Sequence, residues 1–221
     1  MPTEVVIPLF PLGVVLFPDM PLPLHIFEER YKTMVRECLA EDKAFGVVYF
    51  GGDHMHRIGC TAKILEVLNR YDDGCLDILT KGEKRFSIKA LYEDKPYLQA
   101  KIVHFEEPVE KPSAELEVLA AKGLGLLKQL TRSTESEERA VVSGNPDFMR
   151  LSFLIAGNDG FTPSEKQKFL EMTSTHDRLK KSVESLSRML KGVEITKEIQ
   201  RIIGGNGKVP RSLAEKVQKD G

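Results

Sequence analysis

The feature that most constrains this chain is an apolar stretch near its start that is unusually rich in proline. Residues 7–31 read IPLFPLGVVLFPDMPLPLHIFEERY and hold five of the twelve prolines in the sequence. Proline lacks a backbone N–H and interrupts both helices and the ladders of central strands. Short β-branched and aromatic runs that end at proline are typical of barrel or edge strands. We therefore expect such strands at residues 5–7 and 14–17.

The end of the same stretch predicts a turn, an extended segment and a helix. Pro18-Asp19 is a turn dipeptide, and Pro21 and Pro23 favour an extended crossing segment after it. The helix should open at Glu28 and Glu29, since acidic residues stabilise the first turn of a helix. Apolar residues with helical spacing predict one buried face, formed by Tyr31, Met34, Val35, Cys38 and Leu39.

Short β patterns dominate the next part of the sequence. Strands are predicted at residues 45–50, 58–68, 75–81, 85–92 and 97–105, with Asp73-Gly74 as the clearest hairpin turn. Strands joined by such short turns form a small antiparallel barrel or sandwich. We expect this first domain to cover residues 1–108.

Helical signals take over after Pro108 and Pro112, which mark the predicted boundary. Asn145-Pro146 is expected to start one helix, and Thr162 with Glu165 has the spacing of a capping box. A long helix is predicted from an apolar stripe formed by Leu179, Val183, Leu186, Leu190 and Val193. We therefore expect a helical bundle at 109–203 and a frayed tail at 204–221.

Composition narrows the classes to which this protein can belong. Residues 1–108 hold 13 Lys and Arg residues against 17 Asp and Glu residues, so the barrel is a poor surface for nucleic acid. Three cysteines without C-x-x-C spacing indicate reduced thiols and a cytoplasmic protein. We expect neither a signal peptide nor a membrane span.

At this level of detail the sequence resembles a known family. PLFPLGVVLFPDMPLPLHIFEERYKTMV is similar to the signature of the Lon protease N-terminal, substrate-binding domain. IGCTAKILEV, KGEKRFSI and YLQAKI resemble the later strands of that domain, and TPSEKQKFLEMTSTHDRLKKSVESLSRML resembles its closing helices. The resemblance covers about residues 5–195. It implies an α+β fold, in which a PUA-like small antiparallel β-barrel with one embedded helix is followed by a C-terminal helical bundle.

The resemblance also implies a function. The family binds protein or peptide segments before another machine acts on them, so we expect a non-enzymatic adaptor or substrate-recognition module. The ATPase and peptidase modules of the full protease do not fit into 221 residues, which predicts a free-standing domain. Its expected partners are unfolded or extended protein segments, with a protease or chaperone downstream. The alternatives are a PUA-like RNA-binding module and a small-molecule site, and homodimer formation is left open.

The predicted peptide-binding residues are Met20, Pro21, Leu22 and Pro23, because alternate side chains of such an apolar run must point away from the barrel. The competing interpretation is an inter-domain contact against the long C-terminal helix, which we favour for Leu24.

Other candidate sites have weaker support in the sequence. His54 and His56 could face the same side, but a polar hairpin loop explains them better than a metal site. We predict no catalytic residue, metal or cofactor. Phe10, Phe17 and Phe27 are expected in the core.

Overall fold

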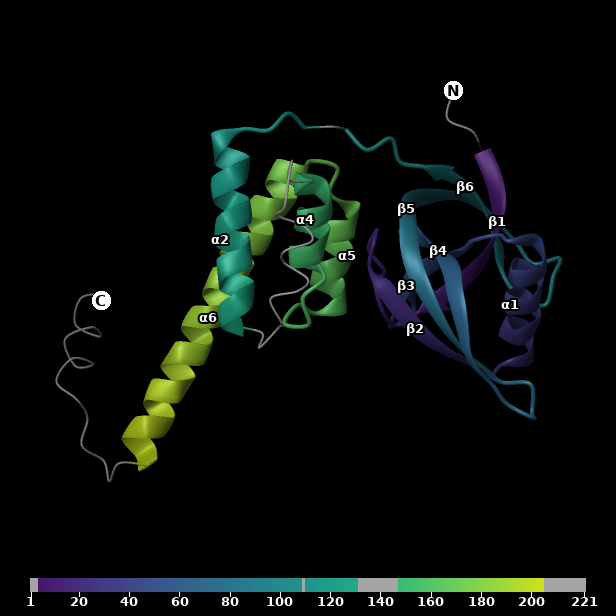
Figure 1. The fold of residues 1–221 in the computed structure, drawn as a ribbon, viewed down its shortest axis with the longest axis horizontal. Helices are drawn as coiled ribbons and strands as arrows, with labels where there is room; N and C mark the ends of the chain where they lie inside the picture. The colour runs from purple at the N-terminus through teal and green to yellow at the C-terminus, as the bar shows by residue number, and fades with distance from the viewer. Residues whose placement is uncertain (1–3, 109, 131–146, 205–221) are drawn as a thin grey trace.

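The fold was analysed in a computed structural model that describes residues 4–108, 110–130 and 147–204. The strands are β1 (Glu4–Leu12), β2 (Pro21–Ile26), β3 (Phe45–Gly51), β4 (His54–Arg70), β5 (Leu76–Tyr92) and β6 (Gln99–His104), and the helices are α1 (Glu29–Glu41), α2 (Ala114–Leu130), α4 (Phe148–Ala156), α5 (Pro163–Glu171) and α6 (Thr175–Gly204). The β part and the helical part lie side by side, joined by a long connection from β6 to α2 (Figure 1).

The strands form a ring with one extra strand on its edge. The sheet order is β2-β5-β4-β3-β1-β6, and a further pairing of β5 with β6 closes the ring. β2 pairs with the first half of β5 and with no other strand described. The predicted α+β class is confirmed, as is a barrel with one embedded helix followed by helices. The barrel is not purely antiparallel, because β1 and β3 run parallel.

The prolines of β1 do not end the strand, contrary to the prediction for residues 5–7. Pro8 is the last residue that pairs with β6, and Leu9 is the first that pairs with β3. A missing N–H is tolerated where a strand changes partner, which explains why β1 continues through Pro8. Pro11 lies beyond the residues that pair with β6, so β3 is its only partner strand among those described. Residues 14–17 are likewise not a strand, although Leu16 and Phe17 are buried.

The strands predicted at 75–81 and 85–92 are one long strand, β5. Gly82 lies at the join, and its N–H donates to the Met20 carbonyl at 2.9 Å. A Cβ atom on Gly82 would lie 2.1 Å from the Phe17 carbonyl oxygen. The glycine therefore lets the segment before β2 cross directly over β5, and the strand continues beneath it.

The apolar side chains form separate clusters in the barrel and in the helices. The cluster between the barrel and α1 contains Tyr31, Met34, Val35 and Cys38, as predicted from helical spacing. Leu39, predicted on the same face, is 37% exposed, so its predicted burial is wrong. Barrel side chains on β1, β3, β5 and β6 form another cluster. A third is formed by the helices described after the barrel, together with Phe17 from the segment before β2.

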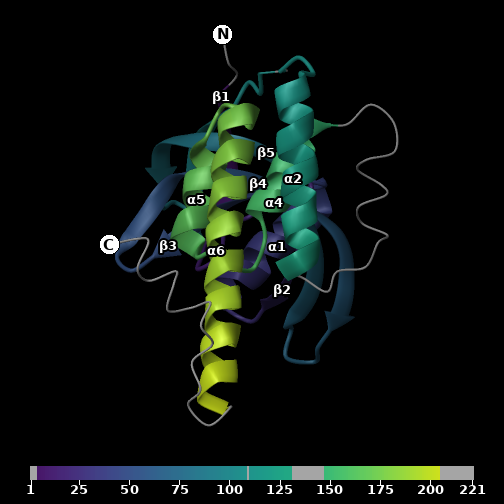
Figure 2. The same ribbon diagram turned by 90° about the vertical axis from the view of Figure 1, so that its left-hand side faces the viewer.

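The C-terminal helices begin and pack largely as their local signals predict. Thr162 and Glu165 form the predicted capping box at the start of α5. Asn145-Pro146 lies outside the described residues, and the side chain of Asp147 caps α4. Figure 2 shows α6 between α2 and α5, with the barrel behind them.

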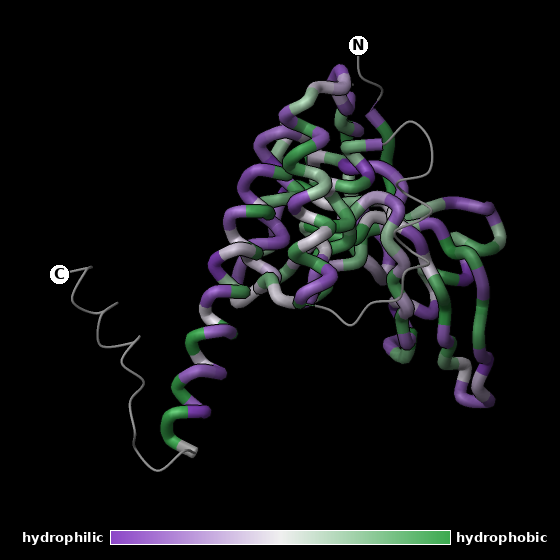
Figure 3. The backbone as a smooth tube through the Cα atoms, turned by 60° about the vertical axis from the view of Figure 1, so that its left-hand side comes forward, coloured by the Kyte–Doolittle hydropathy of each residue, from purple (hydrophilic) through white to green (hydrophobic). Residues whose placement is uncertain are grey.

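The buried stripe of α6 is shorter than predicted. Leu179, Val183 and Leu186 are buried, but Leu190 is only half-buried. Val193, the last residue of the predicted stripe, is 43% exposed. The C-terminal turns of α6 extend past the other helices, and hydrophobic and hydrophilic residues alternate along them (Figure 3).

Two buried arginines meet at the junction of the barrel and the helices. Arg85 on β5 forms a bidentate ion pair with Glu107 and donates to the carbonyls of Leu170 and Met172. Arg178 on α6 donates to the same Met172 carbonyl at 2.7 Å. Each guanidinium is thus supplied with acceptors, which a buried charge requires.

Within the described ranges, none of the helices combines the length and apolar character needed to span a bilayer.

Candidate functional site

The edge strand β2 presents prolines to solvent. Pro21 and Pro23 are exposed, whereas Leu22 and Leu24 are half-buried against the barrel cluster. The Met20 carbonyl accepts a hydrogen bond from Gly82, so strand alternation directs the backbone groups of Pro21 and Pro23 away from β5. Neither proline can donate a hydrogen bond on that outer edge, which protects β2 from pairing with a further strand.

The residues of the predicted peptide-binding site do not share one environment. Met20 packs against both the barrel cluster and the helical cluster, and a Cβ atom on Gly157 would lie 3.1 Å from its methyl group. Met20 is therefore the residue of this run that reaches the helical part. The predicted contact of Leu24 with the long C-terminal helix is wrong, because Leu24 packs against the barrel cluster, as Leu22 does, and not against the helical cluster.

Neighbouring strands extend the surface of β2. We call this surface the β2 face, and define it as Pro21, Pro23, His25, Phe27, Leu65, Asn69, Tyr71, Asp77 and Leu79. Strand register aligns Pro23 with Leu79 and His25 with Asp77, while Asn69 on β4 pairs with the same Asp77. The face therefore combines residues from β2, β5 and β4 that lie far apart in the sequence.

A carboxylate organises the polar part of the β2 face. Asp77 accepts hydrogen bonds from Tyr71 at 2.6 Å and Asn69 at 3.0 Å, and pairs with the His25 ring at 2.6 Å. These hydrogen bonds, that from Tyr71 foremost, lower the pKa of Asp77 to about 2. The His25 ring stacks with Phe27 and meets Tyr71 edge-on. Asp77 thus holds a cluster of aromatic rings at the surface.

The apolar part of the β2 face includes residues that sequence reasoning missed. Phe27 is 61% exposed, so its expected place in the core is wrong, although Phe10 and Phe17 are buried as expected. Leu65 is 55% exposed beside a bulge in β4, where two residues oppose one on β5. An apolar patch with a polar rim is a surface on which another polypeptide can dock.

The histidine pair lies on a strand rather than in the predicted loop. His54 and His56 belong to the start of β4, and their ring centroids are 5.0 Å apart. The His56 ring nitrogen lies 3.2 Å from Glu171 on α5. Nowhere in the described ranges do three His, Cys, Asp or Glu side chains gather in a way that could hold a metal ion.

The cysteines are buried thiols of low reactivity. Cys38, Cys60 and Cys75 are free and buried. Burial raises the pKa of Cys38 to about 11 and also raises the pKa of Cys60. Cys75 donates to the Asp73 carboxylate at 3.1 Å, which raises the pKa of its thiol. A thiol that stays protonated is a poor nucleophile, so these side chains do not support cysteine catalysis.

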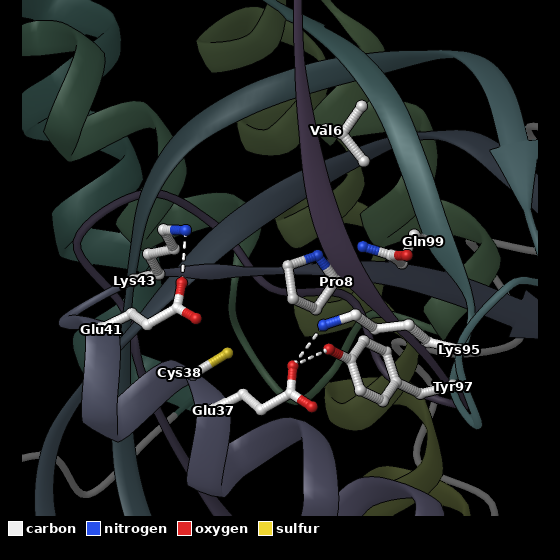
Figure 4. A pocket seen from close by; sticks show the side chains of 9 residues that line it. All are labelled: Val6, Pro8, Glu37, Cys38, Glu41, Lys43, Lys95, Tyr97 and Gln99. Carbon is white, nitrogen blue, oxygen red and sulfur yellow. Dashed lines mark hydrogen bonds and ion pairs between the residues drawn. The ribbon is translucent and has the colours of Figure 1, made fainter.

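Several charged residues that line a small cavity next to α1 pair with one another. Its volume is about 80 Å³, and it is lined by Val6, Pro8, Glu37, Cys38, Glu41, Lys43, Lys95, Tyr97 and Gln99 (Figure 4). Glu37 accepts hydrogen bonds from Lys95 and Tyr97, each at 2.5 Å. The cavity has room for only a few water molecules. These residues therefore fasten α1 to the barrel.

The family model and the similar proteins all point to one family. A family model described as the ATP-dependent protease La (LON) substrate-binding domain matches residues 6–188. The chain is 29% identical to a Lon protease of Dictyoglomus thermophilum, over 97% of this chain and 27% of that protein. It is 31% identical to a Lon protease of Roseiflexus castenholzii, over 83% of this chain and 24% of that protein. The chain thus spans about a quarter of the length of these relatives.

Solved structures share the fold. A Lon N-terminal domain protein from Xanthomonas campestris superposes with a TM-score of 0.63 at 22% identity, covering 80% of this chain and 96% of that one. The N-terminal domain of a Lon protease from the Mycobacterium avium complex gives a TM-score of 0.66 at 21% identity, covering 83% and 98%.

Proposed function

Since this chain belongs to the family of ATP-dependent protease La (LON) substrate-binding domains, we propose that it binds extended segments of other proteins without acting on them chemically. The observation that carries the proposal is the β2 face, which displays Phe27, Leu65, Tyr71 and two prolines at one surface. Bound segments would then pass to a protease or chaperone. The matched region of the family is the substrate-binding domain, distinct from the ATPase and peptidase domains.

The chemistry of the β2 face suggests how such a segment is held. Because Pro21 and Pro23 offer no N–H, a segment does not bind here as an added strand. Affinity comes instead from apolar side chains packed against Phe27, Leu65 and Leu79. The hydrogen bonds around Asp77 keep the His25 and Tyr71 rings in place before the segment arrives, which reduces the entropy lost on binding.

The test measures binding of a fluorescent unfolded polypeptide by anisotropy. We expect Phe27→Ser with Leu65→Ser to weaken binding at least about tenfold, because burying one such side group is worth about 1.5–3 kcal/mol. The melting temperature should stay close to that of the wild type, since both residues are exposed in the free protein. Val118→Ser on α2, which is also exposed, is the matched control and should bind normally.

Two results would contradict the proposal. One is the absence of binding to any unfolded polypeptide at tens of micromolar, and the other is measurable ATP turnover by the purified protein. The RNA-binding alternative predicts affinity for structured RNA that falls steeply with salt, because phosphate contacts release counterions. A gel-shift assay at low and high salt separates it from peptide binding.

A further inference from the structure

A second cavity lies between the start of α1 and the β4–β5 hairpin. Its volume is about 350 Å³, which is enough for one amino-acid residue. It is lined by Glu29, Lys32, Arg36, Arg70, Tyr71, Asp73, Gly74 and Leu76. Three of these residues are basic and two are acidic, so the lining carries one net positive charge.

The acidic groups of this cavity already have partners. The Lys32 side chain is largely buried, and its ammonium donates to the Glu29 carboxylate and to the Asp73 carbonyl, each at 2.9 Å. Both Asp73 carboxylate oxygens accept from Cys75, one from its N–H and one from its thiol. An ammonium has three N–H donors, so Lys32 retains one for a ligand. Its hydrogen bond to Glu29 raises the pKa of Lys32 and keeps it charged.

The guanidinium groups of Arg36 and Arg70 are the positive charges of this cavity that remain available to a ligand. Across the residues that the structure describes, neither Arg36 nor Arg70 is paired with a carboxylate. Arg36 extends from α1 and Arg70 from the end of β4, so they approach the cavity from different elements. Guanidinium groups bind carboxylates with two parallel hydrogen bonds, and such charge-assisted bonds are about twice as strong as neutral ones.

We propose that this cavity binds a single carboxylate of the captured segment, supplied either by an acidic residue or by the C-terminus of the bound polypeptide. The inference rests on the proposed function and adds a preference for acidic segments to it. One net positive charge matches a carboxylate better than a phosphate, which carries up to two negative charges. Tyr71 connects the two sites, since it lines the cavity and belongs to the β2 face. An apolar segment on that face can therefore place a neighbouring acid in the cavity.

The experiment compares labelled apolar peptides that differ only in Asp or Asn, with the variable residue moved through the sequence. A second pair differs only in a free or amidated C-terminus, which separates the two sources of the carboxylate. For the pair that places its acid correctly we expect about tenfold tighter binding of the charged peptide. Arg36→Gln with Arg70→Gln should remove this preference and leave the affinity of the Asn or amidated peptide unchanged. Arg57→Gln, an exposed arginine elsewhere on β4, should keep the preference.

Equal affinity of charged and uncharged peptides at every position would overturn the inference while leaving the proposed function intact. Retention of the preference in the double variant would also overturn it. If no peptide binds, the proposed function fails and the cavity is tested directly with N-acetylaspartate amide. Shifts of the Arg36 and Arg70 guanidinium NMR signals then support a carboxylate site, and the absence of shifts refutes it. Tighter binding of inorganic phosphate than of this carboxylate would refute it as well.

Discussion

Asp77 shows how one residue can organise a surface that is open to water. Its carboxylate lies 2.6 Å from both the His25 ring nitrogen on β2 and the Tyr71 hydroxyl in the turn between β4 and β5. Because both rings also contact each other, the carboxylate determines how the aromatic part of the β2 face is presented. A segment that docks on this face meets rings that are already oriented.

The lowered pKa of Asp77 predicts a pH dependence of stability. A carboxyl group whose folded-state pKa is about 2 stabilises the fold fully above its ordinary pKa, and this contribution is lost as the pH falls toward 2. We expect the melting temperature of the wild type to fall more steeply from about pH 6 to about pH 3 than that of Asp77→Asn. Asp53→Asn, in the turn before β4, should follow the wild type. Parallel curves for wild type and Asp77→Asn would contradict this prediction.

Gly82 is a position at which one added methyl group should destabilise the fold. Its Cβ atom would meet the Phe17 carbonyl at 2.1 Å, so either β5 or the crossing segment has to move. We expect Gly82→Ala to lower the free energy of unfolding by about 1–3 kcal/mol in a urea titration. Gly13→Ala is the control, because no atom lies within 4 Å of its Cβ position. A Gly82→Ala protein as stable as the control would show that the crossing is loosely packed.

At the scale of elements, β2 has one side that packs in the core and an outer edge that is protected from pairing with other strands. Its inner residues Leu22 and Leu24 complete the barrel cluster, and Thr80 donates to the Leu22 carbonyl at 2.8 Å. Its outer edge is exposed, and an exposed edge invites pairing with another polypeptide. Pro21 and Pro23 remove the donors that such pairing needs.

Restoring those donors should therefore promote association. We expect Pro21→Thr with Pro23→Thr to increase the oligomeric fraction relative to wild type as the concentration rises, measured by sedimentation velocity. Pro112→Thr, at an exposed position before α2, should sediment like the wild type. If the double variant also sediments like the wild type, the two prolines are not what prevents pairing at the β2 edge.

At the scale of the whole molecule, Arg85 couples the barrel to the helices. Its side chain is fully buried and binds Glu107 as well as backbone carbonyls at the end of α5. Removing one partner of a buried ion pair leaves the other charge without compensation. The division into domains at residue 108 stays a prediction, and it can be tested through this arginine.

We expect Arg85→Met to cost about 3–5 kcal/mol of stability and to separate the unfolding of the two parts. All five tyrosines lie at or before Tyr97 and the sequence has no tryptophan, so tyrosine fluorescence reports on the barrel alone. Far-UV circular dichroism reports mainly on the helices. The two signals should coincide in the wild type and in Lys84→Met, and diverge in Arg85→Met. Coincident curves in Arg85→Met would show that other contacts couple the parts.

Structural features that depend on residues close together in the chain could be predicted from the sequence. Helical spacing predicted α1 and its buried face, the capping box predicted the start of α5, and Asp73-Gly74 predicted the hairpin between β4 and β5. Turn and capping chemistry depends on neighbours three or four residues away, so it survives without tertiary context. The apolar run before α1 could also be recognised in the sequence. The sequence did not show which of its side chains pack in the barrel and which are exposed.

Contacts between distant residues decided the rest. Residues 14–17 look like a strand, but only the packing of Phe17 over Gly82 shows that they cross β5 instead of joining the sheet. Phe27 is exposed because β2 ends the sheet, and its ring stacks on a histidine held by Asp77, a partner 52 residues from His25. The basic cavity likewise exists because folding brings Arg36 and Arg70 together. Local chemistry therefore determined which elements form, while strand pairing across the barrel determined which of their side chains meet solvent and one another.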